Sequence, residues 1–421
     1  MSQHEIHSKI LKNKENVKQW FINHRKNLFL PFYTSVDVRD SGKKIVGVDA
    51  NLFPAGFNNI CPVDKSNIAE IVKDYIQSHY GENLKKVALI TEEHTNNPPY
   101  WDNVFALQTM LKDAGYDLRV AIPRSFSGTA TMESFSGQKI LVHPSRKQDT
   151  EILIGDDFKP ELIISNNDFS QSYEDWGEGV QTPINPPREM GWYQRKKSTH
   201  FQHYNRLAGE VSQVIGLDPW LLQVQTEVFS GFDLDSEESG IALADRVDQM
   251  LLTIEKEYKK RNFQEPPTVF IKNNAGTYGL GVLAVSSGDE VRNWNSKTRK
   301  QMKVSKGRRT VEEVILQEGV SSALKTDVGT AEPTIYMIGC ELVGGFLRAH
   351  PSKGPTESLN SPGAVFQKLC VSDLEVDEEG NPMENVYGWI ARLSSLAIGM
   401  EMKEMGVQLK GYRQHTCESP L

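Results

Sequence analysis

VFIKNNAGTYGLGVLAV, residues 269–285, places a lysine, two asparagines and three glycines between two apolar runs. The runs are typical of strands, and the segment between them predicts either a plain hairpin turn around Gly276 or Gly279, or a loop that covers phosphates. Lys272 closes the first run, so its ammonium group would project from a strand end toward whatever the loop covers. Small residues let backbone N–H groups approach phosphate oxygens, and a lysine adds the compensating charge.

Neither of the two common phosphate-binding motifs fits this stretch. In GxxxxGK[ST] the lysine follows the glycines, whereas Lys272 precedes them. In GxGxxG the glycines open a helix, whereas the strand-like VLAV follows here. If the stretch is a site, we therefore expect a flap over residues 272–281, folded over a nucleotide between two antiparallel strands.

Downstream segments each carry one polar side chain at a strand end or in a loop. Glu318 ends the strand VILQEGV, where its carboxylate could accept from an adenine amino group while backbone groups near Val320 bind the ring edge. Glu332 begins the strand AEPTIYMI and could take ribose hydroxyls. Arg348 follows two glycines on a strand, and Asn360 lies in the tight loop SLNSPG. Each residue is ordinary singly, and their order is what carries information.

That order resembles the ATP-grasp fold over residues 192–405. In this fold ATP lies between two α+β subdomains and a carboxylate is phosphorylated. The resemblance implies that Lys272 contacts phosphates, that Glu318 meets adenine and that Glu332 takes the ribose. It also implies that Arg348 orients the transferring phosphate and that Asn360 binds magnesium. The flap residues that would cover ATP are Gly276, Thr277, Tyr278, Gly279 and Gly281.

One departure from the family pattern concerns the metal. Several related ligases have Glu-x-Asn at this position, but residue 358 is a serine and the nearest carboxylate is Glu357, three residues before Asn360. Glu357 is therefore the first candidate for the second magnesium ligand, and Glu341 is another.

Six longer segments resemble the ATP-grasp-type glutamate–cysteine ligases of proteobacteria. They follow in order over most of the chain: VDANLFPAGFNNI (48–60), TEEHTNNPPYWDNV (91–104), ELIISNNDFS (161–170), GWYQRKKSTHF (191–201), VFIKNNAGTYGLGV (269–282) and EPTIYMIGCELVGGFLR (332–348). The resemblance implies the first step of glutathione synthesis, in which ATP, L-glutamate and L-cysteine give γ-glutamylcysteine, ADP and phosphate through an acyl phosphate. Family members often carry acidic or other residues at positions 273 and 274, so the roles of Asn273 and Asn274 stay open. A ligase with another amine acceptor and a non-catalytic nucleotide-binding scaffold are the rival hypotheses.

The N-terminal half predicts a substrate domain. A strand at 86–91, a helix at 101–115 and a strand at 116–123 indicate a βαβ unit with a parallel sheet, which 139–144 and 161–168 can extend. Ligands gather at the carboxyl ends of such strands. Asparagines and a KK pair are also ordinary turn and surface residues, so each candidate competes with that plainer interpretation. The candidate holders of glutamate are Asn51, Asn58, Asn59, Glu93, Asn97, Asn167, Arg195, Lys196 and Lys197.

These patterns together predict a mixed α/β and α+β chain. We expect a βαβ-type substrate domain over 1–170, a linker or functional loop over 171–191, and an ATP-grasp-like region of two subdomains over 192–421. The cofactors expected are ATP and Mg²⁺.

Composition narrows the remaining classes. A net charge of −8 over 421 residues disfavours a nucleic-acid partner, and no apolar run reaches the roughly 18 residues of a membrane span. Four cysteines without a CxxC pair argue against a disulfide framework or a zinc cage and fit a reducing cytoplasm. His200 and His203 lack a third ligand at the usual spacing, so surface or substrate contact is expected of them, as of His94, rather than metal binding. The sequence leaves a homo-oligomer open.

Overall fold

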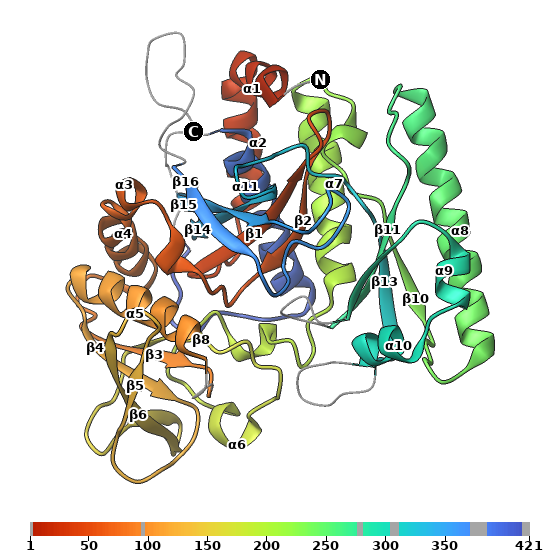
Figure 1. Cartoon of the computed structure of the whole chain (residues 1–421). Helices are drawn as coiled ribbons and strands as arrows, with labels where there is room; N and C mark the ends of the chain where they lie inside the picture. The colour runs from red at the N-terminus through yellow and green to blue at the C-terminus, as the bar shows by residue number, and fades with distance from the viewer. Residues whose placement is uncertain (1–2, 94–96, 276–280, 304–310, 371–384, 415–421) are drawn as a thin grey trace.

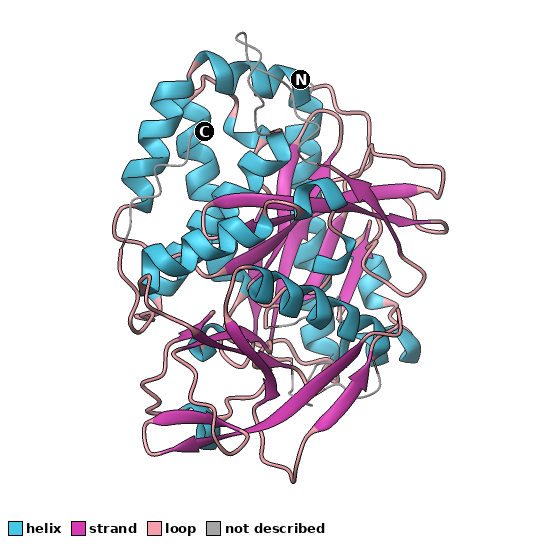
Figure 2. Cartoon of the chain, turned by 90° about the vertical axis from the view of Figure 1, so that its left-hand side faces the viewer, coloured by secondary structure: helices cyan, strands magenta, loops and turns pink. Residues whose placement is uncertain are grey.

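The computed structural model describes residues 3–93, 97–275, 281–303, 311–370 and 385–414. Within these stretches the chain forms three β-sheets with helices around them (Figure 1). One sheet lies in the middle of Figure 1, one at the lower left and one at the right beside α8. Figure 2 distinguishes the helices from the strands that they cover. His94 and residues 276–280 of the expected flap, among them Gly276, Thr277, Tyr278 and Gly279, lie outside the described residues.

The central sheet joins strands from both ends of the chain. Its order is β16-β15-β14-β1-β2, and all neighbouring strands are antiparallel. Every residue of β1 is buried, so its backbone needs partners along both edges, and β2 and β14 supply them. The division expected at residue 170 is therefore not followed, because two N-terminal strands complete a sheet of the C-terminal half. The strands are β1 (Tyr33–Asp40), β2 (Ile45–Asn51), β14 (Thr330–Ile338), β15 (Glu341–His350) and β16 (Val365–Leu369).

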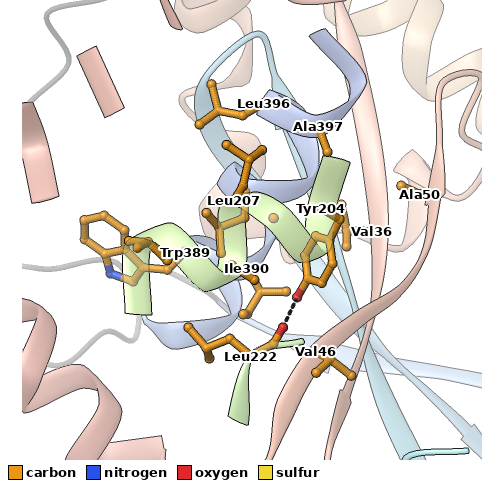
Figure 3. Close-up of a cluster of buried hydrophobic side chains, with 14 of the residues drawn as sticks. Val36, Val46, Ala50, Tyr204, Leu207, Leu222, Trp389, Ile390, Leu396 and Ala397 are labelled. Carbon is orange, nitrogen blue, oxygen red and sulfur yellow. Dashed lines mark hydrogen bonds between the residues drawn. The ribbon is translucent and has the colours of Figure 1, made fainter. Parts of the chain in front are cut away.

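A group of helices covers one face of the central sheet. Helix α11 lies against β1, β2 and β14, and three further helices, α1, α2 and α7, pack around α11. Tyr204 connects this layer to β2, since its hydroxyl accepts from the Gly47 N–H at 2.9 Å. The same hydroxyl donates to the Leu222 carbonyl at 3.0 Å (Figure 3). No described helix is long and apolar enough to cross a lipid bilayer. The helices are α1 (Gln3–Lys12), α2 (Lys14–Arg25), α7 (Lys197–Val214) and α11 (Val386–Glu404).

The lower-left sheet confirms the predicted βαβ unit. Strand β3 (Lys86–Thr91) pairs in parallel with both β4 (Asp117–Ile122) and β8 (Leu162–Asn166). Helix α5 (Pro98–Asp113) connects β3 to β4 and shares one apolar core with α4 (Ile68–Tyr80). The remaining elements are α3 (Pro62–Lys65), the 3₁₀ turn η1 (Phe57–Asn59), β5 (Ala130–Glu133), β6 (Lys139–Gln148) and β7 (Glu151–Ile154).

The expected linker over 171–191 is a packed part of this sheet. It contains α6 (Glu174–Gly177), β9 (Ile184–Asn185) and η2 (Arg188–Met190), and β9 pairs with β8. Trp176 is buried, and its indole N–H donates to the Ser145 hydroxyl at 2.9 Å. The prolines and glycines that suggested a linker therefore belong to an ordered connection whose aromatic side chain is anchored in the core.

The right-hand sheet contains the two apolar runs on either side of Lys272. Strands β11 (Val269–Asn273) and β12 (Val282–Val285) are antiparallel neighbours, as predicted for a flap between two strands. Side chains alternate along β11: Val269 and Ile271 join the core under α8, so Phe270 and Lys272 point to the opposite face. The other elements are β10 (Thr226–Ser230), β13 (Glu313–Glu318), α8 (Glu237–Lys260), α9 (Gly288–Arg292), α10 (Ser296–Lys303) and η3 (Pro219–Leu221).

A disulfide joins two distant segments, contrary to the expectation from cysteine spacing. The sulfur atoms of Cys61 and Cys370 are bonded, although 309 residues separate them in sequence. Cys61 precedes α3, and Cys370 directly follows β16. Spacing motifs detect only cysteines that are close in sequence, so this pair leaves no such signal.

Candidate active site

Two of the cavities formed by the described residues share Asp49 and Asn360. The first cavity has about 640 Å³ of space, partly open to solvent, and lies between the right-hand and central sheets. Lys272 and Gln317 come from the right-hand sheet and Glu332 from the central one. The second cavity, of about 1540 Å³ including its open mouth, lies between the central and lower-left sheets. The arrangement can hold two molecules that meet at a common wall.

Lys272 is a buried cation in the first cavity. Its Nζ donates to the Val48 carbonyl at 3.1 Å and to Gln317 Oε1 at 2.5 Å, both neutral oxygens. Burial lowers the pKa of Lys272 to about 8, although Asp49 acts in the opposite direction. A buried ammonium group held by neutral acceptors is incompletely compensated, so an anion entering the cavity would bind favourably there.

Asp49 and Lys197 form an ion pair at the junction of the cavities. Lys197 is the first residue of α7, and its Nζ donates to Asp49 Oδ1. Burial alone would raise the pKa of Asp49, but Lys197 and Lys272 together lower it to about 2. The carboxylate is therefore ionised at neutral pH, with two lysines beside it.

Asn273 and Asn274 anchor the base of the flap. The Asn274 carbonyl accepts from the Lys197 N–H at 2.8 Å, and its Oδ1 accepts from the Ser198 N–H at 2.9 Å. Asn274 thus satisfies two amides in the first turn of α7, which an α-helix cannot satisfy internally. Asn273 lines the first cavity, and its Oδ1 accepts from the Ala275 N–H at 3.0 Å in a local turn. Gly281 follows the described gap with a φ of 64° and accepts from the Asn273 N–H at 3.2 Å.

Arg348 and Glu332 belong to one buried charge network. Arg348 donates to Asp37 Oδ2 at 2.9 Å and to Glu332 Oε1 at 2.8 Å, and Arg39 Nε lies 2.6 Å from Glu332 Oε2. Burial would lower the pKa of Arg348, but Asp37 and Glu332 raise it well above its usual value. Asp37, Arg39 and Glu332 line the first cavity and Arg348 lines the second, so the network forms part of the wall between them.

Glu318 does not offer its carboxylate to the first cavity. Its two oxygens lie 2.8 Å and 2.7 Å from Lys44 Nζ, and Oε2 also accepts from the Gln225 N–H at 3.1 Å. Side chains alternate along a strand, so when Glu318 points away Gln317 points into the cavity. The expected contact between the Glu318 carboxylate and adenine is therefore corrected: the backbone near Val320, which does line the cavity, remains the candidate.

The metal candidates are separated by the structure. Asn360 lines both cavities, but Glu357 accepts from Lys353 Nζ at 2.9 Å and from the Gly354 N–H at 2.7 Å and lines neither. Glu341 begins β15, seven residues before Arg348, which places it about 24 Å along the strand from Arg348. Glu341 lines neither cavity. Among the described residues, no group of three or more His, Cys, Asp or Glu side chains could hold a metal ion.

Four predicted substrate residues line the second cavity: Asn51, Asn58, Asn59 and Asn97. Glu93 and Asn167 do not line it. Glu93 lies 3.3 Å from Arg124, and Asn167 donates to the Thr91 carbonyl at 3.2 Å and accepts from the Phe169 N–H at 2.9 Å. Asn167 therefore shapes the loop after β8, where Asp168 reaches the cavity instead.

The basic cluster at the start of α7 divides into three different environments. Arg195 is buried and bonds Glu401 at 2.7 Å and 3.1 Å and the Ala50 carbonyl at 2.9 Å, so it supports β2 from behind. Lys196 pairs with Glu313 near the surface at 2.6 Å, and only Lys197 reaches a cavity.

The two histidines of α7 are buried rather than exposed. His200 lies 3.6 Å from Glu401, and His203 lies 2.7 Å from Glu404. Both face α11, so the surface or substrate contact expected of them is not found. The sequence gives no signal that distinguishes a histidine buried between two helices from one that lies at the surface or contacts substrate.

Comparison with known proteins decides the family. The family model for glutamate-cysteine ligase, GshA, matches residues 7–402. The chain belongs to this family. It is therefore an ATP-dependent ligase that joins glutamate and cysteine in glutathione biosynthesis.

One solved structure agrees with the family assignment. A gamma-glutamylcysteine synthetase of Methylobacillus flagellatus KT, itself assigned provisionally, is 34% identical, with a TM-score of 0.85 over 95% of this chain and 96% of that one. A D-alanyl-alanine synthetase A of Vibrio cholerae is 10% identical, with a TM-score of 0.34 over 77% and 82% of the two chains. A glutathione synthetase-like effector of Globodera pallida is also 10% identical, with a TM-score of 0.37 over 87% and 83%. Scores this low add nothing to the assignment. Among curated proteins, none matched.

Sequence reasoning missed several residues that the ligase places at its cavities. Asp37 lies in a strand that the sequence did not single out, and Asp49 lies within a quoted segment whose asparagines drew attention instead. Gln317 stands next to Glu318, to which the resemblance assigns the adenine contact. Every residue of β13 after Glu313 is buried, so burial does not separate Gln317 from Glu318. Only the opposite directions of neighbouring side chains on a strand distinguish them.

Proposed function

We propose that ATP binds in the first cavity with its phosphates at Lys272 and Lys197, and that glutamate and cysteine bind in the second. The observation that carries this proposal is Lys272, a buried cation whose hydrogen bonds go to neutral oxygens in a cavity that meets a second one at Asp49 and Asn360. A phosphate would supply the missing negative charge. The glutamate γ-carboxylate and the γ-phosphate would then face one another at the shared wall.

The reaction would proceed in two steps. The γ-carboxylate attacks the γ-phosphorus, ADP leaves, and an acyl phosphate forms. The cysteine amine then attacks the acyl carbon, phosphate leaves, and the amine gives up a proton. Positioning and charge neutralisation are what a protein contributes to such transfers. Arg348, on the second-cavity side of the wall, is suited to the transferring phosphate.

An ATP-grasp arrangement is consistent with this assignment. The right-hand sheet with α8 would be one subdomain and the central sheet the other, and the first cavity draws its walls from both. Glu332 and Val320 line that cavity, which supports their proposed contacts with the ribose and the adenine edge.

Magnesium would be held by Asn360 and Asp49. Both side chains present oxygen atoms at the junction, and oxygen ligands are those that Mg²⁺ prefers. When bound, the ion would neutralise charge on the phosphates. Glu357, the carboxylate suggested by sequence, lines neither cavity, so we rank it second.

The amide-rich end of the second cavity would orient glutamate. Asn51, Asn58 and Asn59 can both donate and accept, which suits a substrate that carries two carboxylates and one ammonium group. The family assignment supports cysteine as the amine acceptor over the rival amines.

Turnover of Lys272→Met tests the proposal. We expect ADP release in the presence of glutamate and cysteine to fall by at least about 100-fold, because one preorganised charge on a transferring phosphate contributes on that order. Lys196→Met is the matched control, since Lys196 is exposed and pairs with Glu313 outside both cavities. Unchanged turnover in folded Lys272→Met would reject the phosphate site.

Isotope transfer tests the acyl phosphate separately. Glutamate labelled with ¹⁸O in its γ-carboxylate should deliver one ¹⁸O atom to the inorganic phosphate released. If the phosphate carries no label, the γ-carboxylate oxygen never became bonded to phosphorus, and the two-step route through an acyl phosphate would be wrong.

A further inference from the structure

Gln317 is a buried amide in the wall of the first cavity to which the reaction steps above give no role. It is fully buried on β13, opposite Phe270 of β11. Its Oε1 accepts from Lys272 Nζ at 2.5 Å. Its Nε2 is buried and has no hydrogen-bond partner among the described residues.

The orientation of this amide follows from its neighbour. An ammonium group can only donate hydrogen bonds, so the oxygen of Gln317 must face Lys272 and the nitrogen must face away from it. Buried amide donors nearly always have an acceptor in folded proteins. A donor left without one in a cavity wall is suited to an acceptor that a ligand supplies.

The side chains around Gln317 favour a flat ring as that ligand. Phe270, Val282 and Val320 line the same cavity and are apolar, whereas Lys272 marks its charged part. An aromatic base can lie between apolar side chains and present ring nitrogens to a donor at its edge. Glu318, the neighbouring polar residue, is unavailable because Lys44 holds both of its oxygens.

Adenine carries the matching pattern along one edge. Its N7 accepts and its N6 amino group donates, and a glutamine amide can satisfy both atoms at once. Guanine presents two acceptors, O6 and N7, at the same positions, so the amide oxygen would face another oxygen.

We infer that Gln317 recognises the N6/N7 edge of adenine, with Nε2 donating to N7 and Oε1 accepting from N6 beside Lys272, and that it selects ATP over GTP. The inference rests on the proposed binding of ATP in the first cavity. It assigns base selection to the side chain one residue before Glu318, the position that the ATP-grasp resemblance implies.

The test compares ATP with 7-deaza-ATP, in which a C–H group replaces N7. For the wild-type ligase we expect kcat/KM to fall about 3- to 10-fold with 7-deaza-ATP, the effect of losing one neutral hydrogen bond. In Gln317→Glu the carboxylate still accepts from Lys272, which keeps it ionised, but it cannot donate to N7. That variant should therefore use the two nucleotides equally well. Gln317→Leu, which removes both polar atoms, should also lose the discrimination.

A ligand control and a binding measurement make the outcomes distinct. In 3-deaza-ATP a C–H group replaces N3, which lies on the opposite edge of the base. The ratio of kcat/KM with 3-deaza-ATP to kcat/KM with ATP should therefore be the same in all three proteins. Equal use of ATP and 7-deaza-ATP by the wild type, or an unchanged ratio in both variants, would overturn the inference. If Lys272→Met binds ATP as tightly as the wild type, the proposed nucleotide site itself fails. If Lys272→Met binds ATP weakly, but the ratio of kcat/KM for 7-deaza-ATP to that for ATP is the same in the wild type and both Gln317 variants, only the role of Gln317 fails.

Discussion

Replacing Lys272 by methionine should remove the free-energy cost of keeping a charged ammonium group buried in the folded ligase at neutral pH. Burial lowers the pKa of Lys272 from 10.5 to about 8, and a shift of this size corresponds to about 3 kcal/mol. The variant also loses hydrogen bonds to Val48 and Gln317, worth about 1 kcal/mol each. At pH 7 we therefore expect Lys272→Met to unfold with a free energy about 1 kcal/mol higher than that of the wild type, while it loses turnover.

The sign of the pH dependence is the sharper test. Below pH 8 both folded and unfolded wild type carry the proton, so the full cost of the buried charge is present. Between pH 8 and 10.5 the unfolded chain holds more protons than the folded one, so wild-type stability rises with pH relative to the variant. By pH 9.5 the difference should have moved by about 2 kcal/mol in favour of the wild type. Urea denaturation at pH 7 and 9.5 measures it.

Lys196→Met is the control for this series, because its side chain is half exposed and pairs with Glu313. Its stability should follow that of the wild type at both pH values to within about 1 kcal/mol. A stability difference between Lys272→Met and the wild type that is the same at pH 7 and 9.5 would refute the reasoning, because it would mean that the Lys272 ammonium carries no burial cost.

Three other substitutions have defined outcomes. Lys44→Met should lower the free energy of unfolding, measured by urea denaturation, by about 3–5 kcal/mol, because it leaves the Glu318 carboxylate buried without its cation. The double variant Lys44→Met/Glu318→Leu should lose less stability, because no unpaired charge stays buried. Asn274→Ala should lower stability by about 1 kcal/mol and raise the KM for ATP, since the start of α7 loses its cap; an unchanged KM would mean that the flap base does not influence the nucleotide. Asp49→Asn should raise the Mg²⁺ concentration needed for half-maximal turnover, whereas Glu357→Gln should not, and the reverse result would restore the carboxylate suggested by sequence.

The local features of the ligase were predictable because each depends on neighbouring residues. The two apolar runs on either side of the polar segment at Lys272 predict β11 and β12, and both strands are present. The spacing of strand, helix and strand over 86–123 predicts the parallel unit of β3, α5 and β4. Asn360 follows from the order of polar residues and lies at the junction of the cavities.

Contacts between distant segments were not predictable from one sequence. Asp49 meets Lys272 because β2 pairs into a sheet with strands nearly 300 residues later, and no local pattern encodes that pairing. The Cys61–Cys370 disulfide could not be predicted for the same reason, because no local pattern connects cysteines so far apart in sequence. Glu318 was chosen over Gln317 because a carboxylate suggests chemistry, but the pleat of β13 decides which side chain faces the cavity.

A crystal structure with a non-hydrolysable ATP analogue and Mg²⁺ tests the central claim most directly. The account predicts the phosphates within hydrogen-bond distance of Lys272 and Lys197, the metal between Asn360 and Asp49, and the adenine edge at Gln317. A nucleotide bound outside the first cavity, with Lys272 still held only by Val48 and Gln317, would contradict it.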